Sequence, residues 1–223
     1  MSELIQTTRN YGGIKYESQF WNDYKEMGED LLKYKIIKLK IYTGTYEEKE
    51  VIFGISYILK NIMTGELKPE IFHNVKDYID VKEYNIKGNE YLTDFHIRFP
   101  NNANYISQIG FETNKKTKFL IGTEEGEDKK ISSNGGKNII LGTFGCLNKK
   151  LDAMGCLYVS KKEYSKRTLF PYLMLRVKIK NDKKFKEEYN KKYKELPIEY
   201  QYLWKTIFLP DAVFSQIIKY CFI

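Results

Sequence analysis

The stretch that most constrains the fold is residues 139–159, where two apolar runs flank a short polar loop. The first run, 139–141, leads through a glycine-containing segment into the polar loop at 148–150, and a second apolar run follows at 155–159. Two such runs on either side of a turn are typical of a β-hairpin. The loop delivers one carboxylate, Asp152, just before the second strand. A carboxylate held beside backbone N–H groups can bind vicinal hydroxyls, because it accepts O–H bonds while the amides donate to the same oxygens.

The same residues resemble the closing hairpin of the jacalin-related lectins, whose pattern is Phe-Gly, a Gly-x-x-x-Asp loop, an apolar residue and Gly. Phe144-Gly145, Asn148-x-x-x-Asp152 and Met154-Gly155 stand in those places. Three further pieces resemble the family in the same order over about residues 10–160, namely the Gly12-Gly13 turn, residues 88–97 and residues 109–122. Four pieces in register make the resemblance specific for the fold.

The resemblance implies a mainly β domain over residues 1–160, built as a β-prism of three antiparallel sheets with one sugar site. Asp152 would be the carboxylate of that site. The backbone N–H groups of Lys149, Lys150 and the Gly12-Gly13 turn would be its donors. The implied ligand is a mannose- or galactose-type glycan, held without a metal or cofactor.

The loop itself leaves two interpretations open. Asn148 replaces the family's loop glycine, and although asparagine tolerates positive φ better than most residues, the side chains at 148–150 add bulk and charge. In the alternative interpretation, Asp152 caps its own hairpin by accepting backbone N–H bonds, as turn aspartates often do.

Charge divides the chain into two parts. Residues 161–223 contain 15 Lys/Arg and 7 Asp/Glu, whereas residues 1–160 contain 22 of each. The whole formal excess of +8 therefore falls in a C-terminal extension that the resemblance does not cover. A shift of this kind predicts a boundary near Ser160.

We expect the extension, residues 161–223, to be mostly helical and to contact a protein partner. Its aromatic residues recur at helical spacing and would form an apolar stripe, with the lysines on the other face. Large apolar side chains of this kind commonly anchor interfaces, and the residues expected to do so are Tyr189, Tyr193, Trp204, Phe214 and Ile217. The alternative is that the lysines bind phosphates while the tyrosines stack on bases. Because the two kinds of residue fall on opposite faces, we expect no nucleic-acid partner.

Alternation predicts the individual strands. Ile37, Leu39 and Ile41 fall on one face of a strand over 36–42, with lysines on the other, and 51–59 and 95–99 are further strands. Residues 122–138 are predicted to be an exposed loop. Residues 60–80 form an insertion relative to the family pattern.

Several function classes find no support in the sequence. No Gly-x-Ser-x-Gly, Walker or His-Glu-x-x-His pattern occurs, so we expect no enzyme. His73 and His96 lack a partner at metal-ligand spacing and are predicted to lie on the surface or at a sheet edge. Cys146 and Cys156 are predicted to be buried thiols, or else to face each other across the hairpin. No apolar run reaches about 20 residues and the N-terminus lacks a secretory signal, which indicates a cytoplasmic protein without a membrane span.

Two functions follow from these observations. The first is a carbohydrate-binding module with its site at Asp152 and the Gly12-Gly13 turn. The second is a non-enzymatic scaffold or adaptor that keeps the prism and joins a larger assembly through residues 161–223.

Overall fold

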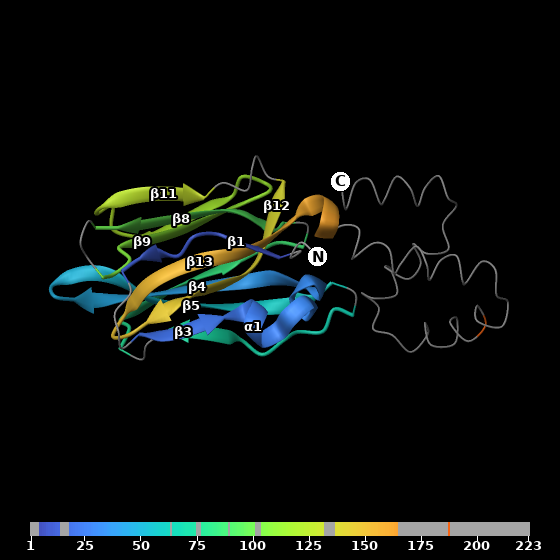
Figure 1. The fold of residues 1–223 in the computed structure, drawn as a ribbon, viewed down its shortest axis with the longest axis horizontal. Coiled ribbons are helices and arrows are strands. Elements are labelled where there is room, and N and C mark those ends of the chain that lie inside the picture. The colour runs from blue at the N-terminus through green and yellow to red at the C-terminus, as the bar shows by residue number, and fades with distance from the viewer. Residues whose placement is uncertain are drawn as a thin grey trace.

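The computed structural model describes residues 5–13, 18–62, 64–74, 77–88, 90–100, 104–131, 137–164 and 187. In this part of the chain nearly all regular structure is β, arranged as three antiparallel sheets along the long axis of the molecule (Figure 1). The predicted mainly β fold with three antiparallel sheets is confirmed. Beyond Tyr164 only Glu187 is described, so the predicted helices and the partner-binding residues Tyr189, Tyr193, Trp204, Phe214 and Ile217 lie outside the described residues.

The first sheet joins the N-terminal strands to the predicted hairpin. Its order is β1-β13-β12-β3, and β2 also pairs with β13. These strands are β1 (Gln6–Thr7), β2 (Tyr11–Gly12), β3 (Gln19–Asn22), β12 (Asn138–Leu147) and β13 (Leu151–Ser160). The predicted hairpin over 139–159 is thus the centre of a sheet whose other strands come from the opposite end of the chain.

The other two sheets have four strands each. The second has the order β6-β5-β4-β7, and the third has the order β10-β9-β8-β11. Their strands are β4 (Tyr34–Tyr46), β5 (Lys49–Asn61), β6 (Ile71–Asn74), β7 (Asp80–Asn85), β8 (Leu92–Phe99), β9 (Gln108–Thr113), β10 (Lys118–Gly122) and β11 (Glu127–Ile131). Helix α1 (Asp23–Met27) and the 3₁₀ helix η1 (Gly28–Lys33) connect β3 to β4.

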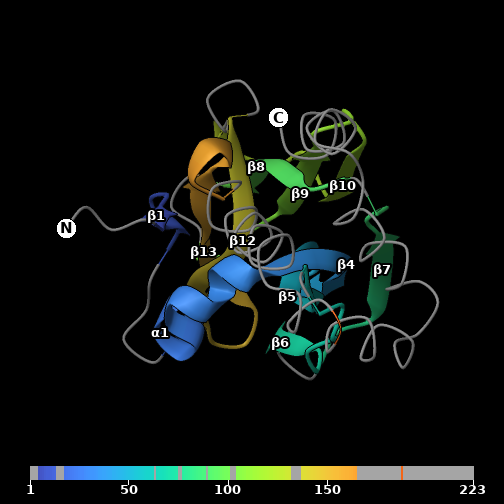
Figure 2. The same cartoon turned by 90° about the vertical axis from the view of Figure 1, so that its right-hand side faces the viewer.

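The three sheets enclose one main hydrophobic core. Seen along the long axis, β12 and β13 form one side, β8 to β10 a second, and β4 to β7 a third (Figure 2). Each side contributes fully buried residues, such as Leu157 from the first sheet, Ile55 from the second and Phe95 from the third. Burial of apolar side chains from every sheet holds the prism closed, because no sheet can cover its inner face alone.

Strand β4 confirms the predicted strand over 36–42 and corrects one of its residues. Leu39 and Ile41 are buried as predicted. A β-bulge between Ile36 and Lys38 interrupts the alternation, and it places Ile36 in the core while Ile37 is only half-buried. A bulge inserts one extra residue, so the side chains on its two sides follow different phases of the pleat.

Two predicted irregular regions contain edge strands. The expected loop over 122–138 holds β11, which pairs with β8 from Glu127 opposite Phe99 onward. The insertion over 60–80 holds β6, which pairs with β5. Both strands are short and lie at the edges of their sheets, where one partner strand is enough to fix them.

A buried carboxylate, Asp23, joins α1 to the first and second sheets. His73 Nε2 lies 2.8 Å from Asp23 Oδ1, and the Tyr57 hydroxyl and the Thr143 backbone N–H both donate to Oδ2. Trp21 stacks on the His73 ring with 4.8 Å between ring centroids. His73 belongs to β6, an edge strand of the second sheet, so its predicted position at a sheet edge is confirmed. The predicted surface position is wrong, because its ring is buried against Asp23 and Trp21.

The described chain leaves the prism at a helical turn over 161–164, after the C-terminal end of β13 (Figure 1). Tyr164 packs against the main core, and its hydroxyl donates to the Tyr34 carbonyl oxygen at 3.2 Å. None of the helices in the described ranges is long and apolar enough to cross a membrane.

Candidate functional site

The candidate site lies at the turn between β12 and β13, at the opposite end of β13 from the helical turn at 161–164. The two strands pair down to Leu147 opposite Leu151, and the Asn148 N–H donates to the Lys150 carbonyl oxygen at 3.1 Å. Lys149 at the tip is exposed. The loop therefore has three residues, 148–150. Because a loop of this length constrains the backbone on both sides, Asp152 has a defined position at the start of β13.

Gly12 comes from the other end of the chain and packs directly against Asp152. It pairs with Ala153 and has a φ of +120°. A Cβ atom at Gly12 would lie 2.2 Å from the Asp152 carbonyl oxygen and 2.9 Å from Ala153 Cα. Only glycine combines this φ with so close an approach. The structure therefore brings together the two segments that the sequence predicted to share a site, the Gly12-Gly13 turn and the 148–152 loop.

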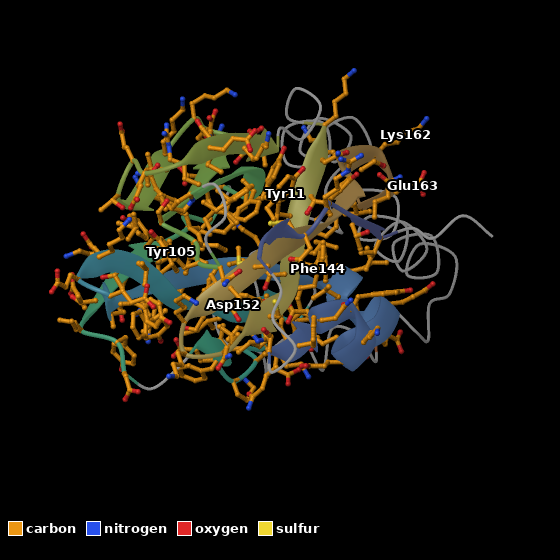
Figure 3. The ribbon with its side chains drawn as sticks, turned by 60° about the vertical axis from the view of Figure 1, so that its left-hand side comes forward. Tyr11, Tyr105, Phe144, Asp152, Lys162 and Glu163 are labelled. Atoms are coloured by element: carbon orange, nitrogen blue, oxygen red, sulfur yellow. The ribbon has the colours of Figure 1, made fainter. Side chains whose placement is uncertain are left out.

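The Asp152 side chain, in contrast, is in a different environment from the one predicted. Its carboxylate is fully buried: Ser18 Oγ–H donates to Oδ2 at 2.8 Å and Lys150 Nζ donates to Oδ1 at 2.9 Å (Figure 3 labels Asp152). Of the two interpretations of the loop, hairpin capping required backbone N–H donors to this carboxylate. Side chains occupy both carboxylate oxygens instead.

Lys150 is the residue that covers Asp152. Its side chain is only 3% exposed, and Nζ lies 4.6 Å from the centroid of the Tyr46 ring, at the end of β4. A cation over an aromatic face gains electrostatic attraction, more so when it is desolvated. The ammonium of Lys150 is therefore held from two sides, by the carboxylate and by the ring. The sequence assigned a role to the Lys150 backbone N–H, whereas the structure makes its side chain the principal contact.

Tyr46 is electrostatically coupled to the same cluster. The pKa of Tyr46 is raised, mainly by the hydrogen bond of its hydroxyl to Glu47, with a smaller contribution from the negative charge of Asp152. Glu47 and Glu48 form the two-residue turn between β4 and β5, with φ values of +51° and +64°. Tyr46, which precedes this turn, is the residue that contacts the lysine loop.

Asn148 does not adopt the backbone conformation expected of a substitute for glycine. In the described residues positive φ at non-glycine positions occurs at Glu47, Glu48 and Lys116, and Asn148 is not among them. The hydrogen bond between the Asn148 N–H and the Lys150 carbonyl closes the loop without a left-handed residue. The expected need for positive φ at this position is wrong for this chain.

Ser18 and Tyr46 are the site residues that the sequence did not reveal. Ser18 is separated from Asp152 by 134 positions and belongs to no recognisable motif. Tyr46 is one of 19 tyrosines, and only the register of β4 against β5 brings it to the loop. Segment 104–107 also joins this end, because the Ile106 N–H donates to the Leu151 carbonyl oxygen at 3.2 Å.

The two cysteines beside the loop are buried thiols, as predicted, and do not face each other. Cys146 is opposite Ala153 and Cys156 is opposite Thr143 in the hairpin register. Burial raises the pKa of both thiols, and the nearby carboxylates of Asp152 and Asp23 contribute to the shifts of Cys146 and Cys156 respectively.

Comparison with known proteins links this geometry to one family. The family model of the jacalin-like lectin domain matches residues 40–157. A comparison with curated protein sequences gives no match.

Several solved structures share the fold. The Calystegia sepium agglutinin is 19% identical with a TM-score of 0.54, over 72% of this chain and 99% of its own. The mannose-binding lectin from champedak is 19% identical with a TM-score of 0.53, over 71% and 99%. Artocarpin complexed with Me-α-mannose is 18% identical with a TM-score of 0.53, over 70% and 99%. At this level of identity, the likeness establishes the fold alone.

Proposed function

This chain belongs to the jacalin-like lectin domain family, and on that ground we propose that it binds carbohydrate without catalysing a reaction. The proposed site is the end of the prism where the Gly12-Gly13 turn meets Asn148, Lys149, Lys150 and Asp152. The observation that carries this proposal is the contact of Gly12 with the Asp152 backbone, because it joins the two segments that the family resemblance assigns to one pocket.

The ligand we propose is a neutral glycan of the mannose or galactose type. Support comes from the similar structures, of which one is a mannose-binding lectin and another is complexed with Me-α-mannose. Vicinal hydroxyls of a hexose would donate to the Asp152 carboxylate and accept from backbone N–H groups of the loop and of the Gly12-Gly13 turn. Binding requires Asp152 to exchange at least one of its present partners for a sugar hydroxyl.

A glycan array with the wild-type protein and the Asp152→Asn variant tests this function. Asparagine is the sharper choice than alanine, because alanine would leave the buried Lys150 ammonium without a partner and could unfold the loop. We expect glycan signals from the wild type that the variant loses, with thermal unfolding as a check that the variant is folded. Equal signals from the two proteins would place binding elsewhere, and no signal from either would refute the proposal.

A second proposed function is the scaffold or adaptor role through residues 161–223. The closed state of Asp152 favours it, because its carboxylate is fully buried and a side chain already donates to each oxygen. In affinity purification, alanine at Trp204 and Phe214 should then release a co-purifying protein. Neutralising Lys183, Lys184, Lys191 and Lys192 should leave it bound. Steeply salt-dependent binding to RNA or DNA would contradict this role.

A further inference from the structure

We propose that the Lys150 side chain makes an autoinhibitory contact at the site: it occupies Asp152 in the ligand-free protein and must leave before a neutral sugar can bind. This inference rests on the proposed carbohydrate function and names the residue that controls it. The starting observation is that Lys150, on a loop at the end of the molecule, has a side chain as buried as those of the core.

The first step concerns geometry. Lys150 is the last residue of the loop and Asp152 is the second residue of β13, and their side chains lie in contact. The ammonium reaches back to Asp152 Oδ1 at 2.9 Å, while its neighbour Lys149 extends into solvent. Two adjacent lysines on one loop thus adopt opposite roles, and the buried one fills the place next to the carboxylate that a sugar hydroxyl would need.

The second step concerns the groups that hold the ammonium. Desolvation of an ammonium is costly unless a carboxylate and further polar or π contacts compensate for it. Lys150 has both, since Asp152 faces it from β13 and the Tyr46 ring lies 4.6 Å from Nζ. Ser18 donates to the second carboxylate oxygen, so each oxygen of Asp152 has a side-chain donor.

The third step concerns what a ligand must replace. A sugar hydroxyl and the ammonium would both form a charge-assisted hydrogen bond with the carboxylate, but only the ammonium also brings a full opposite charge to it. A neutral sugar therefore competes with a stronger donor that is covalently attached and always at the site. The lysine can move out without unfolding the hairpin, because only its flexible side chain needs to rotate.

Isothermal titration with methyl α-mannoside tests the proposal, using wild type, Lys150→Met, Lys149→Met and Lys150→Met/Asp152→Asn. Methionine keeps the length of the chain and removes the charge. Lys149→Met removes the same charge from the adjacent exposed position and is the matched control. We expect Lys150→Met to bind about tenfold or more tightly than wild type. Lys149→Met should match the wild type, and the double variant should lose the gain.

Lysine reactivity provides a readout that does not depend on affinity. In reductive methylation of the ligand-free wild type, Lys150 should react much more slowly than Lys149, with fragmentation in the mass spectrometer separating the two. Asp152→Asn and Tyr46→Leu should both accelerate Lys150. Saturating methyl α-mannoside should accelerate it too, because the displaced side chain enters solvent.

The outcomes separate this inference from the function on which it rests. Equal affinities of wild type and Lys150→Met would overturn the role of Lys150 and leave carbohydrate binding intact. Equal methylation rates of Lys149 and Lys150 in the free protein would overturn it as well. Failure of every variant to bind a glycan would refute the proposed function, and the inference with it.

Discussion

At the residue scale, the two most informative side chains are Asp23 and Asp152, which are both buried and are held in different ways. Asp23 accepts from a histidine, a tyrosine and a backbone N–H that come from three different strands. Asp152 accepts from a serine and from a lysine on its own loop. The first arrangement is spread over the fold and is not easily released, whereas the lysine of the second can rotate away. We therefore assign Asp23 to stability and Asp152 to the site.

Asp23→Ala should destabilise the protein by about 3 kcal/mol or more, because several buried donors lose their common acceptor. Chemical denaturation monitored by tryptophan fluorescence would measure the change. Asp30→Ala is the control: its partner Lys33 lies 2.6 Å away, but both side chains are mostly exposed, so the loss should be below about 1 kcal/mol. Similar losses at the two positions would contradict the structural role of Asp23.

The thiols of Cys146 and Cys156 should be inert in the folded protein. Both are buried, and burial raises the pKa of each, so little thiolate forms at neutral pH. Iodoacetamide at pH 8, followed by peptide mass spectrometry, should leave both unmodified until denaturant is added. Rapid labelling of either one under native conditions would show that the hairpin opens readily.

Of the residues at the site, the sequence indicated those that belong to a local pattern and missed those supplied by tertiary structure. Asp152 and Gly12 were recognisable because each belongs to a short motif. Ser18 and Tyr46 reach the carboxylate and its lysine through pairings over long sequence separations. The burial of His73 was likewise invisible, because its partner Asp23 lies 50 positions away.

At the element scale, the hairpin of β4 and β5 has an unusual turn. Two-residue hairpin turns with positive φ at both positions favour Asn-Gly, since other residues adopt this conformation at a cost. Here Glu47 and Glu48 occupy both positions. The turn adjoins Tyr46, whose ring contacts Lys150, so a strained turn lies next to the proposed site.

Glu48→Gly should stabilise the protein by roughly 1 kcal/mol, because glycine adopts a φ of +64° without steric conflict. Glu50→Gly, two residues further on in β5, is the matched control and should destabilise by about 0.5–1 kcal/mol, since glycine weakens a strand interior. Urea denaturation of the two variants would compare them. Changes of the same sign would argue against strain in the turn.

Strand prediction from alternation was accurate where a strand has one buried face and failed where the pleat is interrupted or the strand lies at an edge. The strand over 95–99 alternates cleanly, and Phe95 and Ile97 are buried. In β4 the bulge moved Ile36 inward. Strand β11 is charged and glycine-flanked, so its composition resembles that of a loop, and only pairing with β8 makes it a strand.

At the scale of the whole molecule, the prism closes by joining the N-terminal strands to the final hairpin. Residues before 40 lie outside the family match, yet β1, β2 and β3 pair with β12 and β13. The described chain then leaves at the end of β13 remote from the proposed site. The proposed sugar site therefore lies at one end of β13, and the proposed partner-binding segment, residues 161–223, begins at the other end.

A chain truncated after Tyr164 should fold cooperatively, and one truncated after Ser160 should be less stable by about 1–3 kcal/mol. Tyr164 packs on the core and donates to the Tyr34 carbonyl, and the shorter chain loses both contacts. Circular dichroism during thermal unfolding would compare them, with Tyr164→Ala in the longer chain as a control for the side chain. Failure of the longer chain to fold would mean that residues beyond 164 cover part of the core.

The most direct test of carbohydrate binding at the proposed site is a titration of the ¹⁵N-labelled protein with methyl α-mannoside, followed by two-dimensional NMR. Resolved amide signals would show where the ligand acts, independently of how tightly it binds. We expect saturable shifts confined to Gly12, Gly13 and residues 148–152, and larger shifts at lower ligand concentration in Lys150→Met. Saturable shifts clustered at another surface, or a spectrum unchanged by any glycan in both proteins, would contradict a sugar site at Asp152.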